Sequence, residues 1–168
     1  KVVEQKKEPI VTTIHTKQIE LIRRYIREGK NVFICGGSGV GKSYVLKAVL
    51  GSLNHVELQA EHLKSKSPFL QFIRPSTKHV FIEDYDPMFK PIIERVSDGD
   101  RLSRGSLLVT TKNMCMYPNF ETVFIPKHKP EVLMTLVEEK GADVYAAAVR
   151  SMGNIRNFFT YLEGYDEM

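Results

Sequence analysis

Short hydrophobic runs alternate along the chain with longer stretches in which hydrophobic residues recur every three or four positions. The short runs predict strands, and the recurring pattern predicts helices. The predicted strands are Asn31–Cys35, Val56–Ala60, His79–Ile82, Leu107–Thr111 and Glu121–Ile125. The predicted helices are Thr16–Glu28, Lys42–Leu50, Ser67–Ile73, Pro87–Val96, Pro130–Lys140 and Val144–Leu162, the last of them interrupted at Gly153.

This order of strands and helices predicts an α/β fold in which a mostly parallel sheet lies between layers of helices. After Ile125 the pattern becomes purely helical, which indicates a small helical unit at the C-terminal end. We therefore expect a flexible, solvated tail at residues 1–8, an α/β core at residues 9–126 and a small helical lid at residues 127–168.

Composition narrows the class of protein only slightly. The chain has 168 residues with 24 Lys and Arg and 20 Asp and Glu, a formal net charge of +4, which permits a polyanionic partner such as DNA. The charged N-terminus lacks the apolar core of a secretory signal, no run reaches the roughly 18 apolar residues of a membrane span, and 2 cysteines are too few for a disulfide framework. These features predict a soluble cytoplasmic or nuclear protein that is not secreted and has no membrane partner, and Lys1 in place of methionine indicates a domain of a longer chain.

A glycine-rich stretch between the first strand and the second helix gives the strongest chemical signal. It reads Gly36-Gly37-Ser38-Gly39-Val40-Gly41-Lys42-Ser43 and matches the phosphate-binding pattern G-x-x-x-x-G-K-[ST] at every fixed position. Glycines let the backbone N–H groups wrap an anion, and the helix N-terminus adds positive potential. We expect Lys42 to reach the β- and γ-phosphates of a nucleoside triphosphate and the Ser43 hydroxyl to bind Mg²⁺. The motif predicts a P-loop NTPase with a three-layer αβα core.

Two acids follow the strand His79–Ile82, at the end of a parallel strand where ligands bind. In P-loop proteins this position carries an acid that holds Mg²⁺ and a second acid that polarises the attacking water. The usual order is Asp then Glu, and here it is reversed. Glu83 is therefore the candidate metal ligand and Asp84 the candidate base, although the reversal leaves the division of roles between them open. Asp86, which precedes Pro87, is expected to cap the next helix.

Polar residues beyond the strand Leu107–Thr111 are candidates to reach the γ-phosphate or the water. Asn113 is the first choice and Thr111 the second, with an ordinary turn cap as the alternative for Asn113. In the last helix, Arg156 lies off the hydrophobic stripe and is a candidate nucleotide ligand, with Arg150 as a weaker competitor.

In this order the motifs resemble the AAA+ ATPases, and most of all the clamp loaders, initiators and helicase loaders of DNA replication. By this resemblance Gly36–Ser43 is the Walker A motif and Ile82–Asp86 the Walker B motif. Asn113 stands at the sensor 1 position and Arg156, in Gly153-Asn154-Ile155-Arg156, at the sensor 2 position of the lid. The segment around Ile10 is similar to the linker that lies against the adenine.

The resemblance implies an enzyme that hydrolyses ATP with Mg²⁺, acts on DNA and works in an oligomer whose subunits share active sites. The chain departs from it in having a short lid and no Arg between Asn113 and Arg150, where many relatives carry the arginine finger. The core also resembles superfamily 3 viral helicases, through Leu108–Cys115. A small-molecule P-loop kinase and a non-hydrolysing switch remain alternatives. The basic positions Arg23, Arg24, Arg27 and Lys30 form either a nucleic-acid contact or a solvated helix face.

Overall fold

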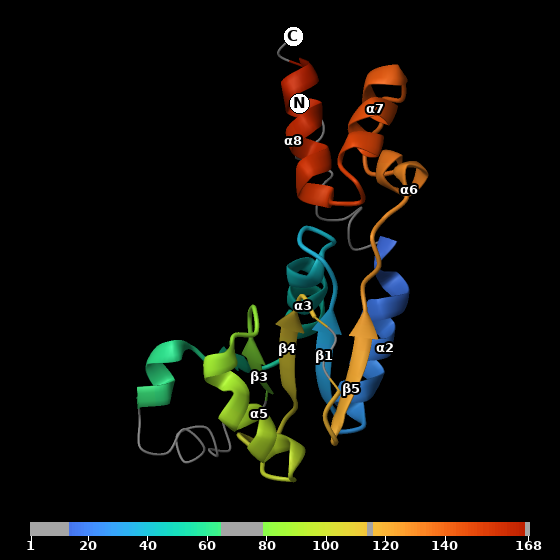
Figure 1. The fold of residues 1–168 in the computed structure, drawn as a ribbon. Coiled ribbons are helices and arrows are strands. Elements are labelled where there is room, and N and C mark those ends of the chain that lie inside the picture. The colour runs from blue at the N-terminus through green and yellow to red at the C-terminus, as the bar shows by residue number, and fades with distance from the viewer. Residues whose placement is uncertain (1–13, 65–78, 114–115, 167–168) are drawn as a thin grey trace.

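A five-stranded sheet forms the centre of the molecule in the computed structural model, which describes residues 14–64, 79–113 and 116–166 (Figure 1). The strand order is β2-β3-β4-β1-β5, and all the pairs are parallel. The strands are β1 (Asn31–Cys35), β2 (His55–Glu57), β3 (His79–Ile82), β4 (Leu107–Thr111) and β5 (Phe120–Phe124). The predicted α/β fold with a parallel sheet is confirmed.

Helices cover both faces of this sheet. The described helices of the core are α2 (Thr16–Arg27), α3 (Lys42–Leu50), α5 (Lys90–Ser97) and the 3-10 helices η1 (Ala60–Lys64) and η2 (Pro87–Phe89). Because side chains alternate along a strand, Val32 and Ile34 of β1 join a buried cluster with α2 and α3, whereas Phe33 and Cys35 join the cluster with η2 and α5. This alternation of side chains gives the sheet two buried faces and accounts for the three layers, which are helices, sheet and helices.

Two predicted elements of the core differ from the observed ones by more than one residue at an end. The strand expected at Val56–Ala60 ends at Glu57, because Leu58 turns into the core under α5 and Ala60 starts the 3-10 helix η1. The helix expected at Pro87–Val96 begins as η2, where the Asp86 carboxylate accepts a hydrogen bond from Met88 N at 3.0 Å, and continues as α5. The predicted Asp86 cap is confirmed. The helix predicted at Ser67–Ile73 lies outside the described residues.

The C-terminal helices are α6 (Pro130–Met134), α7 (Ala142–Arg150) and α8 (Ile155–Asp166), and they enclose a hydrophobic cluster of their own. The helix expected at Pro130–Lys140 ends early, because the chain turns at Thr135 and the Lys140 side chain bonds the Met134 and Val137 carbonyls. The predicted interruption at Gly153 is confirmed, since both Met152 and Gly153 have positive φ. This unit stands over the carboxyl ends of the strands (Figure 1). The boundary at residues 126/127 stays a prediction.

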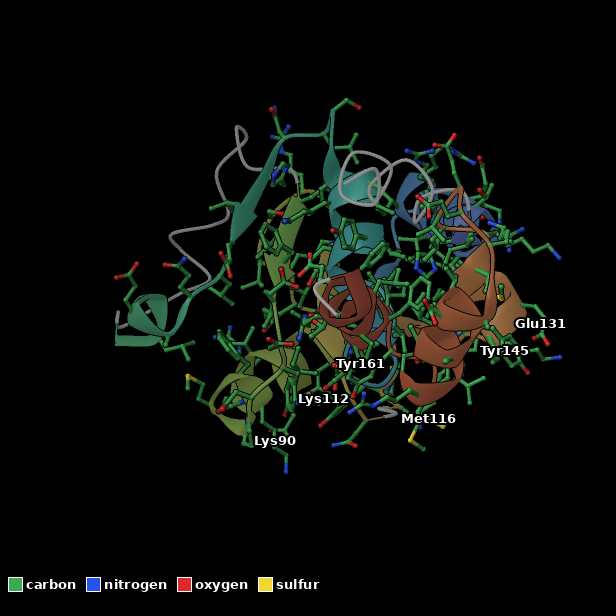
Figure 2. The ribbon with its side chains drawn as sticks, turned by 90° about the horizontal axis from the view of Figure 1, so that it is seen from above. Lys90, Lys112, Met116, Glu131, Tyr145 and Tyr161 are labelled. Atoms are coloured by element: carbon green, nitrogen blue, oxygen red, sulfur yellow. The ribbon has the colours of Figure 1, made fainter. Side chains whose placement is uncertain are left out.

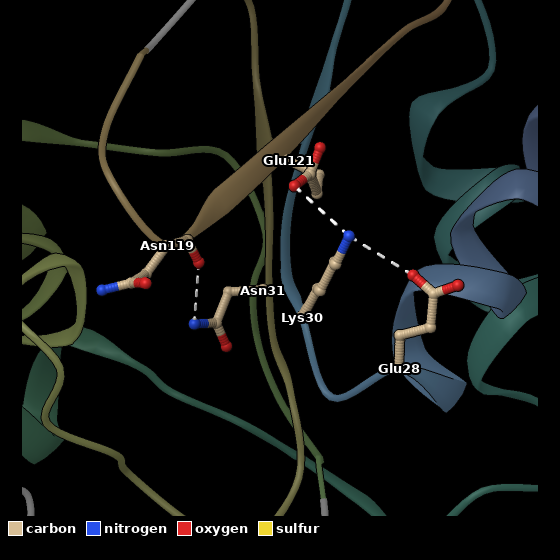
Figure 3. Close-up of polar contacts among 5 residues, drawn as sticks. All are labelled: Glu28, Lys30, Asn31, Asn119 and Glu121. Carbon is tan, nitrogen blue, oxygen red and sulfur yellow. Dashed lines mark hydrogen bonds and ion pairs between the residues drawn. The ribbon is translucent and has the colours of Figure 1, made fainter.

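Polar side chains fix the register at the opposite end of the sheet. Asn31 donates to the Asn119 carbonyl at 3.1 Å and accepts from Leu107 N at 2.9 Å, so it ties β1 to the start of both neighbouring strands. Lys30 pairs with Glu28 at 3.3 Å and with Glu121 at 3.8 Å (Figure 3). Within the described residues, no helix has the length and apolar character that a membrane crossing requires.

Candidate functional site

The glycine-rich loop joins β1 to α3 at the carboxyl end of the sheet. Gly39 and Gly41 have φ of 73° and 112°, a left-handed region that residues with a Cβ atom rarely adopt. Lys42 folds back over the loop and donates hydrogen bonds to the carbonyls of Gly36 at 2.6 Å and Gly37 at 2.8 Å. The loop and its lysine therefore share one concave surface at the N-terminus of α3.

The two acids after β3 lie beside this loop. The Glu83 carboxylate accepts a hydrogen bond from Ser43 Oγ at 3.1 Å and another from Thr110 Oγ1 at 3.4 Å. Thr110 also accepts a bond from Asp84 N at 2.8 Å, and Asp84 adopts a φ of 64°. The buried threonine of β4 thus fixes the turn that carries both acids.

A cavity of about 350 Å³ collects residues from the loop, the acidic turn, the end of β4 and the start of α8. Among the described residues, the following line it: Ser38, Gly39, Gly41, Lys42, Ser43, Tyr44, Asp84, Lys112, Ile155 and Arg156. The predicted residues Lys42, Ser43, Asp84 and Arg156 are thereby brought together from segments far apart in the sequence.

The charges around this cavity influence one another. The pKa of Lys42 is lowered, first by burial and then by Lys112 and Arg156, while Asp84 opposes the shift. Burial and neighbouring cations both disfavour the charged lysine. An anion placed between these cations would relieve their mutual repulsion, so the cavity is electrostatically suited to a polyanion.

The start of α8 is bonded directly to the glycine-rich loop. Asn154 Nδ2 donates to the Ser38 carbonyl at 2.8 Å, and Ile155 N donates to the Gly39 carbonyl at 2.6 Å. A Cβ atom at Gly39 would lie 2.0 Å from Asn154 Oδ1. Close packing against Asn154 is therefore a second reason for glycine at this position.

A pair of histidines supports the loop from its other side. The His15 and His128 rings lie 5.1 Å apart, and His128 Nε2 donates to the Val40 carbonyl at 2.8 Å. His15 is buried, and a Cβ atom at Gly41 would lie 2.2 Å from its Nε2. Burial, followed by the charge of His128, lowers the pKa of His15 to about 4, against a smaller opposing effect of the Val40 backbone. His15 is therefore neutral at pH 7.

Ser43 and Glu83 fit the chemistry of Mg²⁺, because their hydroxyl and carboxylate oxygens are the hard ligands this ion prefers. No cluster of three or more His, Cys, Asp or Glu able to hold a metal occurs among the described residues. Mg²⁺ commonly takes one or two protein oxygens and completes its shell with phosphates and water, so this donor set matches a nucleotide-dependent site.

Some of the predicted site residues are not among the described residues that line the cavity. Asn113 is exposed and contributes backbone atoms to a turn, where its N–H donates to Thr111 Oγ1 at 3.3 Å, and Lys112 lines the cavity in its place. Arg150 stacks on Tyr161 with 4.4 Å between its guanidinium carbon and the ring centre. Ile10 and the segment Met114–Cys115 lie outside the described residues. The roles assigned to these residues stay predictions.

Sequence reasoning missed Lys112, Asn154 and His15. Lys112 adjoins the selected Asn113, and Asn154 lies two residues before the selected Arg156; the sequence carried no signal that would choose between such neighbours. A histidine in the turn before the first helix carried no signal of its contact with the glycine-rich loop.

Together, the parallel sheet, the loop between β1 and α3 and the acids after β3 define the P-loop NTPase fold. No family model and no curated protein sequence matches the chain. Solved structures do resemble it at low identity, so they show the fold alone.

The similar structures include an AMPPCP-bound DnaA from Aquifex aeolicus, with a TM-score of 0.59 and 12% identity over 90% of this chain and 60% of that one. The ORC1 protein of Aeropyrum pernix in complex with DNA has a TM-score of 0.56 and 14% identity over 86% of this chain and 57% of that one. A signal transduction ATPase with numerous domains from Pyrococcus horikoshii, which carries a tetratricopeptide repeat sensor, has a TM-score of 0.55 and 12% identity. This match covers 83% of this chain and 28% of that one. The chain thus spans 60% or less of the length of each of these proteins.

Proposed function

We propose that this chain binds ATP with Mg²⁺ and hydrolyses it, as an AAA+ type ATPase that acts on DNA in an oligomer. The observation that carries the proposal is the cavity in which the glycine-rich loop, Lys42, Asp84 and the lid residue Arg156 meet. A phosphate-binding loop, a carboxylate and a lid cation around one cavity are the parts that phosphoryl transfer to water requires.

The geometry supports a division of roles between the acids. Glu83 already contacts the Ser43 hydroxyl, so these residues would hold Mg²⁺, which on binding supplies positive charge to the phosphates. Asp84 lines the cavity and is the candidate to orient the attacking water and accept its proton. Lys42 would neutralise the β- and γ-phosphates, and Arg156 would bind the nucleotide from the lid side.

The test is ATP binding and hydrolysis by the full chain with Mg²⁺, comparing Lys42→Ala with Lys47→Ala. Lys47 is an exposed lysine of the same helix and makes no contact with the cavity, so it serves as the matched control. We expect Lys42→Ala to lower ATP affinity or turnover at least tenfold, since bonds to charged groups contribute about 1.5–3 kcal/mol each. Phosphoryl transfer to a small molecule would favour a kinase instead, and tight binding without turnover a switch.

The proposed DNA contact is supported by the basic face of α2. Lys17, Arg24 and Arg27 line a shallow groove there beside the acidic Glu20, and none of the three cations has an ion-pair partner within the described residues. The ORC1 protein, which shares the fold and was solved in complex with DNA, points in the same direction. Cations held on one helix face suit the evenly spaced phosphates of DNA.

Charge removal on α2 tests this surface. The double variant Arg24→Ala, Arg27→Ala should weaken DNA binding and reduce the slope of log affinity against log salt by about 2, one for each lost phosphate contact. The control, Lys90→Ala with Arg95→Ala, removes the same net charge from exposed positions of α5, which packs on the opposite face of the sheet from α2. Equal losses in both double variants would show a non-specific charge effect and count against α2 as the DNA surface.

A further inference from the structure

Lys112 occupies a position in the cavity that no assigned role explains. It follows β4, the strand between the acid-bearing β3 and the loop-bearing β1. Its side chain is exposed and forms no ion pair or hydrogen bond within the described part of the chain. In the view from above, Lys112 lies toward α8, whereas Lys90 lies further out on α5 (Figure 2). A cation is therefore available at the end of β4.

The arrangement of cations around the cavity indicates what Lys112 would meet. Lys42 is held at the base of the loop by the carbonyls of Gly36 and Gly37, and Arg156 comes from the lid. Lys112 lies on the β4 side with Asp84 and is close enough to affect the ionisation of Lys42. Because a P-loop wraps the α- and β-phosphates, a cation on the side of the carboxylates faces the terminal phosphate.

We propose that Lys112 binds the γ-phosphate of ATP and neutralises, from within the same chain, the charge on the transferred phosphoryl group. This assignment rests on the proposed ATPase function. In hydrolysis the water oxygen bonds to the γ-phosphorus, and the bond to the β–γ bridging oxygen breaks with its electron pair left on ADP. One water proton passes to Asp84. Negative charge on the γ-phosphoryl oxygens lies within reach of a cation at the end of β4 throughout this step.

This charge matters because the chain has no Arg between Asn113 and Arg150, the region where many AAA+ ATPases carry an arginine finger. A lysine supplies a point charge without the planar fork of arginine, so it neutralises a phosphate without bidentate geometry. Lys112 would thus supply, from within the chain, part of the positive charge that an arginine finger supplies from a neighbouring subunit in many AAA+ ATPases.

The experiment compares binding of AMPPCP and ADP, with Mg²⁺, to the full chain by titration calorimetry, together with turnover of ATP. We expect Lys112→Ala to weaken AMPPCP binding roughly 10- to 100-fold, the range of a lost bond to a charged group, and to leave ADP binding within about twofold. Turnover of ATP should fall as well, and Lys112→Arg should restore part of both losses. Retained ADP binding shows that the variant is folded.

The controls are Lys90→Ala, an exposed lysine outside the cavity, and Asn113→Ala, the rival residue at the same strand end. Unchanged AMPPCP binding in Lys112→Ala, or equal losses for both nucleotides, overturns the assignment, as does an AMPPCP-specific loss found only in Asn113→Ala. If Lys42→Ala abolishes binding and Lys112→Ala has no effect, this assignment alone fails. A wild-type chain that binds neither nucleotide overturns the proposed function with it.

Discussion

The hydroxyl of Thr110 joins the acids that follow β3, and one substitution isolates its contribution. It accepts from Asp84 N at 2.8 Å and contacts Glu83 Oε2 at 3.4 Å. Thr110→Val keeps the shape of the side chain but leaves the Asp84 N–H without this acceptor. We expect a loss of about 1–3 kcal/mol in the free energy of unfolding, measured in urea, and a fall in kcat for ATP of roughly tenfold because the acidic turn is no longer fixed.

Ser106→Ala is the matched control for Thr110→Val. Its hydroxyl is also buried, but it has no hydrogen-bond partner among the described residues, so its removal should change stability and turnover little. Equal kcat in Thr110→Val and the wild type would show that Thr110 does not position the acids.

The lowered pKa of His15 leads to a prediction of how the stability of the fold depends on pH. Its pKa is lowered from 6.5 to about 4 in the folded state, so the unfolded chain binds the proton first as the pH falls. Stability is therefore full above about pH 6.5 and declines as the pH falls towards 4, by up to about 3 kcal/mol from this group. Urea unfolding at pH 7 and pH 5 should show a smaller decline in His15→Gln than in the wild type. Parallel declines in the two proteins would exclude His15 as the source.

The contact between the glycine-rich loop and α8 is a property of elements, and a double-mutant cycle measures it. Gly39→Ala would place Cβ 2.0 Å from Asn154 Oδ1 at a φ of 73°, so it should destabilise the fold by more than the roughly 1–2 kcal/mol of left-handed strain. In the background of Asn154→Ala the clash is removed and the strain remains. The cost of Gly39→Ala in urea unfolding should then drop, and additive costs would contradict the proposed packing.

At the scale of helices and strands, the elements that could be predicted from the sequence are those marked by a pattern of neighbouring residues. The hydrophobic runs located β1, β3 and β4 to the residue, and the motif located the loop, because these depend on neighbours in the chain. The end of α6 and the choice of Lys112 over Asn113 at the end of β4 depend on tertiary contacts and on the twist after a strand. Those features leave no periodic signal, so the sequence could not predict them.

At the scale of the whole molecule, the cavity joins the sheet-bearing core to the C-terminal helices, since it is lined by the glycine-rich loop and Asp84 and also by Ile155 and Arg156 of α8. A nucleotide bound there would contact both units and stabilise both. At a nucleotide concentration 100 times the dissociation constant, binding adds about 2.7 kcal/mol to the free energy of unfolding, which raises Tm by roughly 5–10 °C for a chain of this size.

ATP should also slow hydrogen exchange in α8 as well as in α3. Arg156→Ala should keep the protection of α3 and lose that of α8, because the cation that α8 contributes to the cavity is removed. Protection confined to α3 in the wild type would mean that the bound nucleotide does not contact α8.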